Sequence, residues 1–248
     1  GIENPFVTFL RFLLIPTMIN LFIAFLMINF FYKEQFKNDL LIHSREPIKD
    51  HELATLSKLS LILLLALISI KIMMTILNLQ FDFRLVYIAT TSALLILVFS
   101  KERFQIVRKV DWHTLVFFMA MFILMKSAWN TGFFQSEIDA LNINILSVPV
   151  ILILSVSLSQ LISNVPLVAL YLPMLFHAGA STEEMMALAA GSTIAGNFLI
   201  LGAASNVIII QNAEKKSGET ISFLEFAKIG IPLTILNILV YWIYFIII

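Results

Sequence analysis

Seven long apolar stretches follow one another along the chain, separated by short polar connections. Six are long enough to cross a bilayer as helices, which takes roughly 20 apolar residues: roughly 7–31, 57–77, 83–99, 113–130, 185–212 and 223–247. The seventh, at about 145–176, is interrupted by Pro149, Asn164, Pro166 and Pro173. This pattern predicts an all-α integral membrane protein with several spans.

The tripeptide Ser-Asn-Val occurs twice inside these apolar stretches. The residues are Ser163, Asn164 and Val165, followed by Pro166, and Ser205, Asn206 and Val207, preceded by Gly202, Ala203 and Ala204. A helix break at membrane depth is tolerated only where it faces protein or a water-filled cavity. Two breaks with small polar side chains are typical of a secondary transporter whose binding site lies near the midplane.

Composition supports a membrane location and excludes several other classes. The chain is 60% hydrophobic and 13% charged, with a mean hydropathy of +0.95, whereas soluble domains are about 25% charged. The lipid bilayer is therefore its predicted partner, and a net charge of zero argues against nucleic acid. The chain has no Cys, and its four His residues are not paired at metal-ligand spacing. We predict no cofactor and no metal site apart from a coupling ion.

Lys and Arg predict the orientation of the spans, because they collect in cytoplasmic connections. The connections at 33–58 and 101–109 are rich in Lys and Arg and are expected inside. Those at 131–144 and 177–184 have neither residue and are expected outside. The 145–176 stretch then enters and leaves on the external face, which predicts a re-entrant hairpin.

In this hairpin, Ser163 and Asn164 lie at the tip. Its first arm carries a polar stripe, formed by Ser155, Ser157, Ser159 and Gln160, which is expected to face protein or a cavity. The alternative is a single bent span, which would place the basic residues at 215–216 outside.

Two segments near the ends of the chain resemble each other. They contain Phe6, Phe9, Arg11, Pro16 and Asn20, and Phe223, Phe226, Lys228, Pro232 and Asn237. The charge pattern gives them opposite orientations, which suggests an inverted repeat; the alternative is chance similarity between two apolar helices.

The repeat hypothesis divides the chain into three parts. Residues 1–32 would be the last span of a truncated first repeat, and 33–56 a cytoplasmic linker between repeats. Residues 57–248 would be the second repeat, with the hairpin at 145–176 and a broken span at 185–212. The rest of the first repeat, which is largely missing here, is expected upstream of Gly1.

Four motifs resemble those of the ion transporter superfamily. They are Asp111–Phe118 ("DW-x-TL-x-FF"), Ser163–Leu167 ("(S/D)N-x-P"), Gly196–Val207 ("GN-x-TLIGA-x-ANV") and Gly218–Phe226 ("G-x-x-I-x-F-x-x-F"). The superfamily includes arsenite permeases, NhaD-type sodium–proton antiporters, and citrate and divalent-anion transporters; the resemblance is to its C-terminal portion. The chain departs from the pattern at Phe198, where the family often has Thr.

The resemblance and the two breaks together predict the residues of a substrate- or ion-binding site. They are Ser163, Asn164, Val165, Pro166, Asn197, Gly202, Ala203, Ala204, Ser205 and Asn206. Na⁺ would be held at Ser163, Asn164, Ser205 and Asn206. The helix N-terminus at Pro166 would favour an anion. The structural alternative is that Asn164 and Asn206 only cap helix ends.

The predicted function is secondary active transport of an inorganic or organic anion by alternating access, coupled to Na⁺ or H⁺. The alternatives are a Na⁺/H⁺ antiporter of the same superfamily and a channel. No enzyme is predicted, since the spans lack paired Asp, a Ser–His pair and a zinc motif. No Asp or Glu lies deep in a span, so this chain offers no obvious proton carrier. We expect a multi-pass protein of the cell membrane (plasma or inner). A homodimer is an option because dimerisation is common in such folds, but the sequence does not show it.

Overall fold

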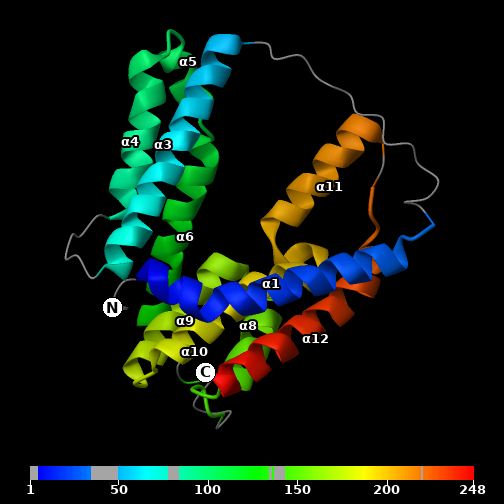
Figure 1. Cartoon of the computed structure of the whole chain (residues 1–248). Helices are drawn as coiled ribbons and strands as arrows, with labels where there is room; N and C mark the ends of the chain where they lie inside the picture. The colour runs from blue at the N-terminus through cyan, green and yellow to red at the C-terminus, as the bar shows by residue number, and fades with distance from the viewer. Residues whose placement is uncertain (1–4, 35–49, 78–83, 134–135, 137–142, 219) are drawn as a thin grey trace. The chain divides into compact units, whose positions relative to one another are not determined.

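Helices make up nearly all of the chain that the structure, a computed structural model, describes: residues 5–34, 50–77, 84–133, 136, 143–218 and 220–248 (Figure 1). The helices are α1 (Pro5–Phe31), α3 (His51–Ile76), α4 (Leu85–Phe99), α5 (Arg103–Arg108), α6 (Trp112–Asn130), α8 (Val148–Ile162), α9 (Asn164–His177), α10 (Thr182–Ile194), α11 (Ala204–Ser217) and α12 (Phe223–Ile247). Two 3₁₀ turns, η1 (Ala195–Asn197) and η2 (Ile200–Gly202), separate α10 from α11. These described residues contain no strand, so the all-α prediction is confirmed for them.

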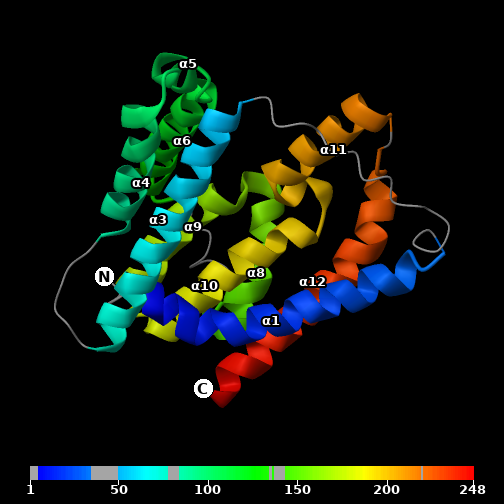
Figure 2. The same ribbon diagram turned by 45° about the horizontal axis from the view of Figure 1, so that its top comes forward.

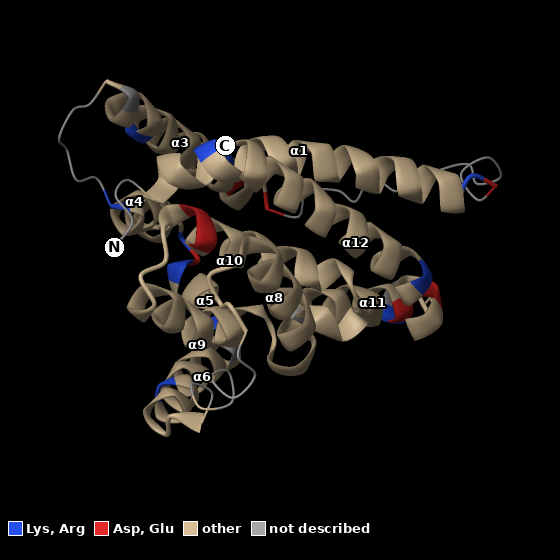
Figure 3. Ribbon diagram, turned by 90° about the horizontal axis from the view of Figure 1, so that it is seen from below, with Lys and Arg blue, Asp and Glu red and all other residues tan. Residues whose placement is uncertain are grey.

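Three of the described helices are long and apolar enough to cross a membrane: α1, α3 over His51–Thr75, and α12. Shorter apolar helices include α4, α8 and α9. Charged residues collect near helix ends and in connections, and the middle turns of α8, α9 and α12 carry none (Figure 3). This distribution is the one expected for helices surrounded by lipid.

The chain forms two compact units, which are described separately. One unit combines Gly1–Asp39 with Val116–Ile248, and the other is Leu40–Leu115. A division into compact units does not test a division into sequence repeats, so the predicted repeat boundaries stay predictions. Most of the predicted 33–56 linker lies outside the described residues.

In the Leu40–Leu115 unit, α3 packs against α4. The buried Ser60 hydroxyl of α3 donates to the carbonyl of Ser92 in α4 at 2.7 Å. The Ser92 hydroxyl is satisfied within its own helix, since it donates to the Ile88 carbonyl at 2.9 Å. A hydrogen bond from a small side chain thus joins the two helices at their contact.

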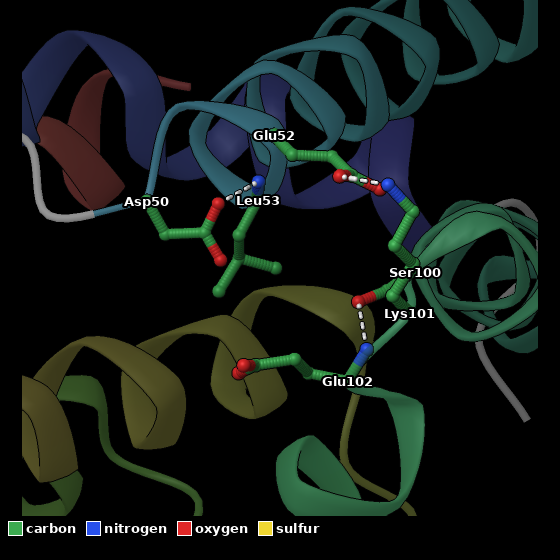
Figure 4. Close-up of polar contacts among 6 residues, drawn as sticks. All are labelled: Asp50, Glu52, Leu53, Ser100, Lys101 and Glu102. Carbon is green, nitrogen blue, oxygen red and sulfur yellow. Dashed lines mark hydrogen bonds and ion pairs between the residues drawn. The ribbon is translucent and has the colours of Figure 1, made fainter.

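Polar contacts also define the ends of these two helices (Figure 4). Asp50 caps the start of α3 by accepting from the Leu53 N–H at 2.9 Å. Glu52, in the first turn of α3, pairs with Lys101 at 2.9 Å and raises the pKa of that lysine. Both partners are exposed, so this ion pair contributes little stability.

In the larger unit, α1 and α12 lie side by side and run in opposite directions (Figures 1 and 2). The Tyr244 hydroxyl donates to the Arg11 carbonyl at 3.3 Å, near the start of α1 and the end of α12. At the other ends of the two helices, the Tyr32 hydroxyl donates to Glu225 at 3.3 Å. The start of α1 thus lies beside the end of α12, and the end of α1 beside the start of α12. The two helices are antiparallel.

The core of this unit is built where α8, α9, α10 and α12 meet. Gly191 lets α10 approach α8 closely, since a Cβ there would lie 2.8 Å from the Cβ of Ser155. Small residues at such contacts are the usual device of membrane helices, whose association rests on packing rather than on exclusion of water. The fully buried side chains of this unit include Ile151, Leu152, Leu167, Leu175, Met186 and Leu188.

Both predicted interruptions appear as breaks in the helices. α8 and α9 meet at Ser163 and pack against each other. The 185–212 stretch is divided into α10, η1, η2 and α11. A re-entrant path from one membrane face and the inverted repeat stay predictions.

Candidate transport site

The first break is confined to one residue, Ser163. Its N–H donates to the Ser159 carbonyl at 3.0 Å and ends α8, while its own carbonyl accepts from Leu167 at 3.2 Å and begins α9. Its backbone has φ 68° and ψ 162°, a region that residues with a Cβ seldom occupy and that costs about 1–3 kcal/mol. The surrounding helices hold this strained geometry in place.

The start of α9 presents unpaired polar groups. The N–H groups of Asn164 and Val165 have no acceptor among the described residues, and Pro166 has no N–H to satisfy. The side-chain oxygen of Asn164 is buried and also unpaired. Two backbone donors at the positive end of a helix dipole attract an anion, and the amide oxygen beside them can bind a cation or a hydroxyl.

The second break extends over residues 195–203. The Phe198 N–H donates to the Ala195 carbonyl at 3.2 Å, and the Gly202 N–H donates to the Leu199 carbonyl at 2.9 Å. Each turn is therefore closed by a hydrogen bond between residues three positions apart. Leu199 and Ala203 are extended between and after these turns. The regular helix ladder is lost here, and its carbonyls need donors from elsewhere.

Two side-chain amides supply such donors to adjacent carbonyls. Gln160, in the last turn of α8, donates from Nε2 to the Ala195 carbonyl at 3.0 Å. Asn206, in the first turn of α11, donates from Nδ2 to the Gly196 carbonyl at 2.7 Å. We refer to these two contacts as the amide clamps. The Gln160 clamp joins the first arm of the hairpin to the second break.

Two glycines allow the backbone of the second break to pack closely. A Cβ on Gly202 would overlap the Ala195 carbonyl and lie 2.7 Å from Oε1 of Gln160. A Cβ on Gly230 of α12 would overlap the carbonyl of Asn197. The Gln160 Oε1 is buried there without a hydrogen-bond partner among the described residues.

The residues predicted for the site occupy different environments. Among the described residues, no hydrogen bond joins Ser163 or Asn164 to Ser205 or Asn206. The ligand-binding role of all ten predicted residues stays a prediction. Ala204 begins α11; of the others, Pro166 and Gly202 are buried, Ser163, Asn164, Ala203 and Asn206 are half-buried, and Val165, Asn197 and Ser205 are exposed.

The polar stripe on α8 is buried on one side of the helix. The prediction that it faces protein is confirmed for Ser155 and Ser159, which are fully buried. Ser157 is exposed and does not contact protein in this way, so its facing a cavity stays a prediction. Two residues correspond to about 200° around a helix, so Ser157 points to the opposite side from its two neighbours in the stripe.

Gln160 connects the two breaks and is absent from the ten residues predicted for the site. Its membership of the polar stripe is the signal that the sequence offers, and it indicates only a contact with protein or a cavity. The carbonyl that Gln160 contacts lies 35 residues away. No local sequence pattern predicts a contact between residues so far apart in the chain.

Comparison with known proteins gives one match to a family. The sequence model of the citrate transporter family matches residues 1–185, three quarters of the chain. Citrate transporters are among the proteins whose motifs this sequence resembles, so the match agrees with the resemblance. No solved structure matches the chain.

Curated relatives point in the same direction. A protein of Dictyostelium discoideum that bears the name transporter arsB is 35% identical over 60% of this chain and 27% of its own length. A 46 kDa membrane protein of Mycobacterium leprae is 31% identical over 62% of this chain and 38% of its own length. The P protein of Mus musculus is 31% identical over 61% of this chain and 20% of its own length. The chain thus matches well under half the length of each of these relatives.

Proposed function

Because the chain belongs to the citrate transporter family, we propose that it forms part of a secondary transporter that moves an inorganic or organic anion across a membrane. The start of α9 is the observation that carries this proposal. It combines two unpaired N–H groups with a buried, unpaired amide oxygen at Asn164. The start of α11 differs, because the amide of Asn206 there is engaged with the Gly196 carbonyl.

The chemistry of this site favours an oxyanion. Backbone N–H groups at a helix start bind carboxylate, phosphate or sulfate oxygens without a cationic side chain. Neither α8 nor α9 carries a Lys, Arg, Asp or Glu. An anion therefore meets no like charge on the two hairpin helices.

The proposed coupling ion is Na⁺ or H⁺. Na⁺ would bind oxygens of Ser163, Asn164, Ser205 and Asn206. The Nδ2 of Asn206 is engaged with Gly196, so its Oδ1 is the atom that remains for an ion. Proton coupling would require a titratable group from outside the middle turns of the described spans, since these carry no carboxylate.

The remaining parts of the proposal concern the whole transporter. We propose alternating access, a multi-pass location in the cell membrane and assembly as a homodimer. Broken helices at a midplane site support alternating access because such sites are built between moving halves in known transporter folds.

The test is uptake of labelled citrate, succinate, sulfate and arsenite by the full-length protein in liposomes, with and without a Na⁺ gradient. We expect saturable uptake of one of these solutes and a loss of that uptake in Asn164→Ala. The matched control is Asn130→Ala, which removes the same side chain from the exposed end of α6, outside both breaks. This control variant should transport normally.

Three results would contradict the proposal. Uptake that never saturates would indicate a channel. Normal uptake by Asn164→Ala would make the first break structural. Absence of uptake for all four anions, with Na⁺-driven proton movement instead, would indicate a Na⁺/H⁺ antiporter.

A further inference from the structure

A second group of buried polar side chains lies on the packed helices α1 and α12. Asn20 of α1 is 7% exposed, and Asn237 and Thr234 of α12 are 2% and 0% exposed. All three lie in the middle of long apolar helices. Polar side chains at such depth are costly and usually have a function.

The antiparallel register, fixed by the contacts between α1 and α12, predicts that Asn20 and Asn237 lie at the same level of the two helices. Next to them, the hydroxyls of Thr17 on α1 and Tyr241 on α12 are 2.8 Å apart. Asn20 lies about one turn beyond Thr17, and Asn237 lies about one turn before Tyr241. The predicted repeat also aligns these two asparagines.

Four polar atoms in this group have no hydrogen-bond partner among the described residues. They are Oδ1 and Nδ2 of Asn20, Oδ1 of Asn237 and Oγ1 of Thr234. Each buried unpaired group costs about 1–3 kcal/mol. The hydroxyl of a Thr within a helix can donate to the carbonyl four residues earlier. The Thr75 hydroxyl does so to the Lys71 carbonyl at 2.9 Å. Thr234 does not, and its hydroxyl is left for another partner.

The oxygens that remain are neutral. α1 has no charged residue between Arg11 and its end at Phe31, and α12 has none after Lys228. Asn20 also lies beside the Tyr241 hydroxyl, which can accept from its Nδ2, so Oδ1 of Asn20 is the atom that remains for an ion. Neutral oxygens without a carboxylate suit a monovalent cation, because divalent cations generally take carboxylates among their ligands.

We propose that α1 and α12 hold a Na⁺ ion between them, bound by Oδ1 of Asn20, Oδ1 of Asn237 and Oγ1 of Thr234. This site uses none of the ten residues predicted for the transport site, and the proposal does not depend on that site. Because its ligands come from two helices, the ion joins them at mid-length and stabilises their packing.

Thermal unfolding of the purified full-length protein in detergent tests this site. NaCl is titrated against choline chloride at constant ionic strength, for wild type, Thr234→Val and Asn237→Leu. Both variants should raise the Na⁺ concentration that gives half of the stabilisation by at least about tenfold, as loss of a group that supports a metal ligand already does. Thr75→Val, which removes a hydroxyl already satisfied within α3, should leave it unchanged.

Asn164→Ala distinguishes this site from Na⁺ at the first break. It should leave the Na⁺-dependent stabilisation in place. If Asn164→Ala abolishes the stabilisation and Thr234→Val does not change it, the ion is at the break and the proposal is wrong. It is also wrong if wild type is stabilised equally by NaCl and choline chloride, which would indicate buried water in place of an ion. Should Asn237→Leu not fold, Thr234→Val decides alone, since Val has nearly the shape of Thr.

Discussion

The two breaks carry the same tripeptide but differ in whether its asparagine is hydrogen-bonded. At the first break a single strained residue, Ser163, separates two helices, and the Asn164 oxygen is left unpaired. At the second, residues 195–203 form two short turns, and Asn206 donates to the Gly196 carbonyl. Asn164 is thus available to a ligand, while Asn206 already stabilises the backbone. The same sequence motif has different consequences because its neighbours differ.

The largest expected effect separates the two asparagines by function. Asn164→Ala should lower the rate of anion uptake by about 10- to 100-fold, because it removes the amide N–H₂ that can donate to the anion and the oxygen that can bind the coupling ion, and a hydrogen bond to a charged partner contributes about 1.5–3 kcal/mol. Its melting temperature should change little, since the deleted oxygen has no partner among the described residues. Uptake in liposomes and thermal unfolding in detergent measure the two effects. A large loss of stability in Asn164→Ala would remove the contrast between the breaks.

The second prediction concerns the close packing at the second break. Gly202→Ala should lower the free energy of unfolding by about 2–3 kcal/mol, since the added Cβ overlaps a backbone carbonyl that cannot turn away. Gly196→Ala is the matched control, because its Cβ would lie 3.2 Å from the Ala203 Cβ and needs only a small adjustment. Chemical denaturation in detergent compares the two. Equal losses would show that this region is not tightly packed.

The third prediction tests the amide clamps. Gln160→Leu and Asn206→Leu should each lower the free energy of unfolding by about 1–2 kcal/mol, since each leaves a carbonyl of the second break without its donor. Gln160→Glu is the sharper variant, because its carboxylate cannot donate to Ala195. Hydrogen exchange at residues 195–203 should rise in all three variants. Unchanged exchange would mean that the carbonyls are satisfied in another way.

The smallest expected effect concerns backbone strain at the first break. Ser163→Gly should raise the free energy of unfolding by about 1 kcal/mol, because glycine occupies φ 68° without a steric penalty. Ser163→Ala keeps the Cβ and should give no such gain. Thermal unfolding of the two variants makes the comparison. Equal stability would show that a Cβ imposes no strain on the backbone at Ser163.

Much of the helical framework can be predicted from the apolar pattern, because helix length and composition are local properties. Helices α1 and α12 begin within two residues of the positions expected for the first and last spans. The apolar pattern places the start of α3 six residues too late, because a polar turn at 51–56 precedes the apolar run and is stabilised by the Asp50 cap. The first break lies at Ser163 itself, and the second lies just before Ser205, so both tripeptides mark a break.

The partners of the polar side chains cannot be predicted in the same way. Gln160 reaches a carbonyl 35 residues away, and Gly230 meets the backbone of Asn197 from another helix. Both contacts depend on how the helices approach one another in space. Amphipathic patterns indicate which face is buried but not which atom will be found there.

By itself, the sequence determined a helical membrane protein, its family and the location of two interruptions, because apolar length, proline and short motifs act locally. Only the tertiary structure decided that one asparagine is left unpaired while the other supports the backbone, and that Thr17 of α1 meets Tyr241 of α12. The physical reason is that hydrogen bonding is satisfied atom by atom, and the atoms that complete it come from helices far apart in the sequence.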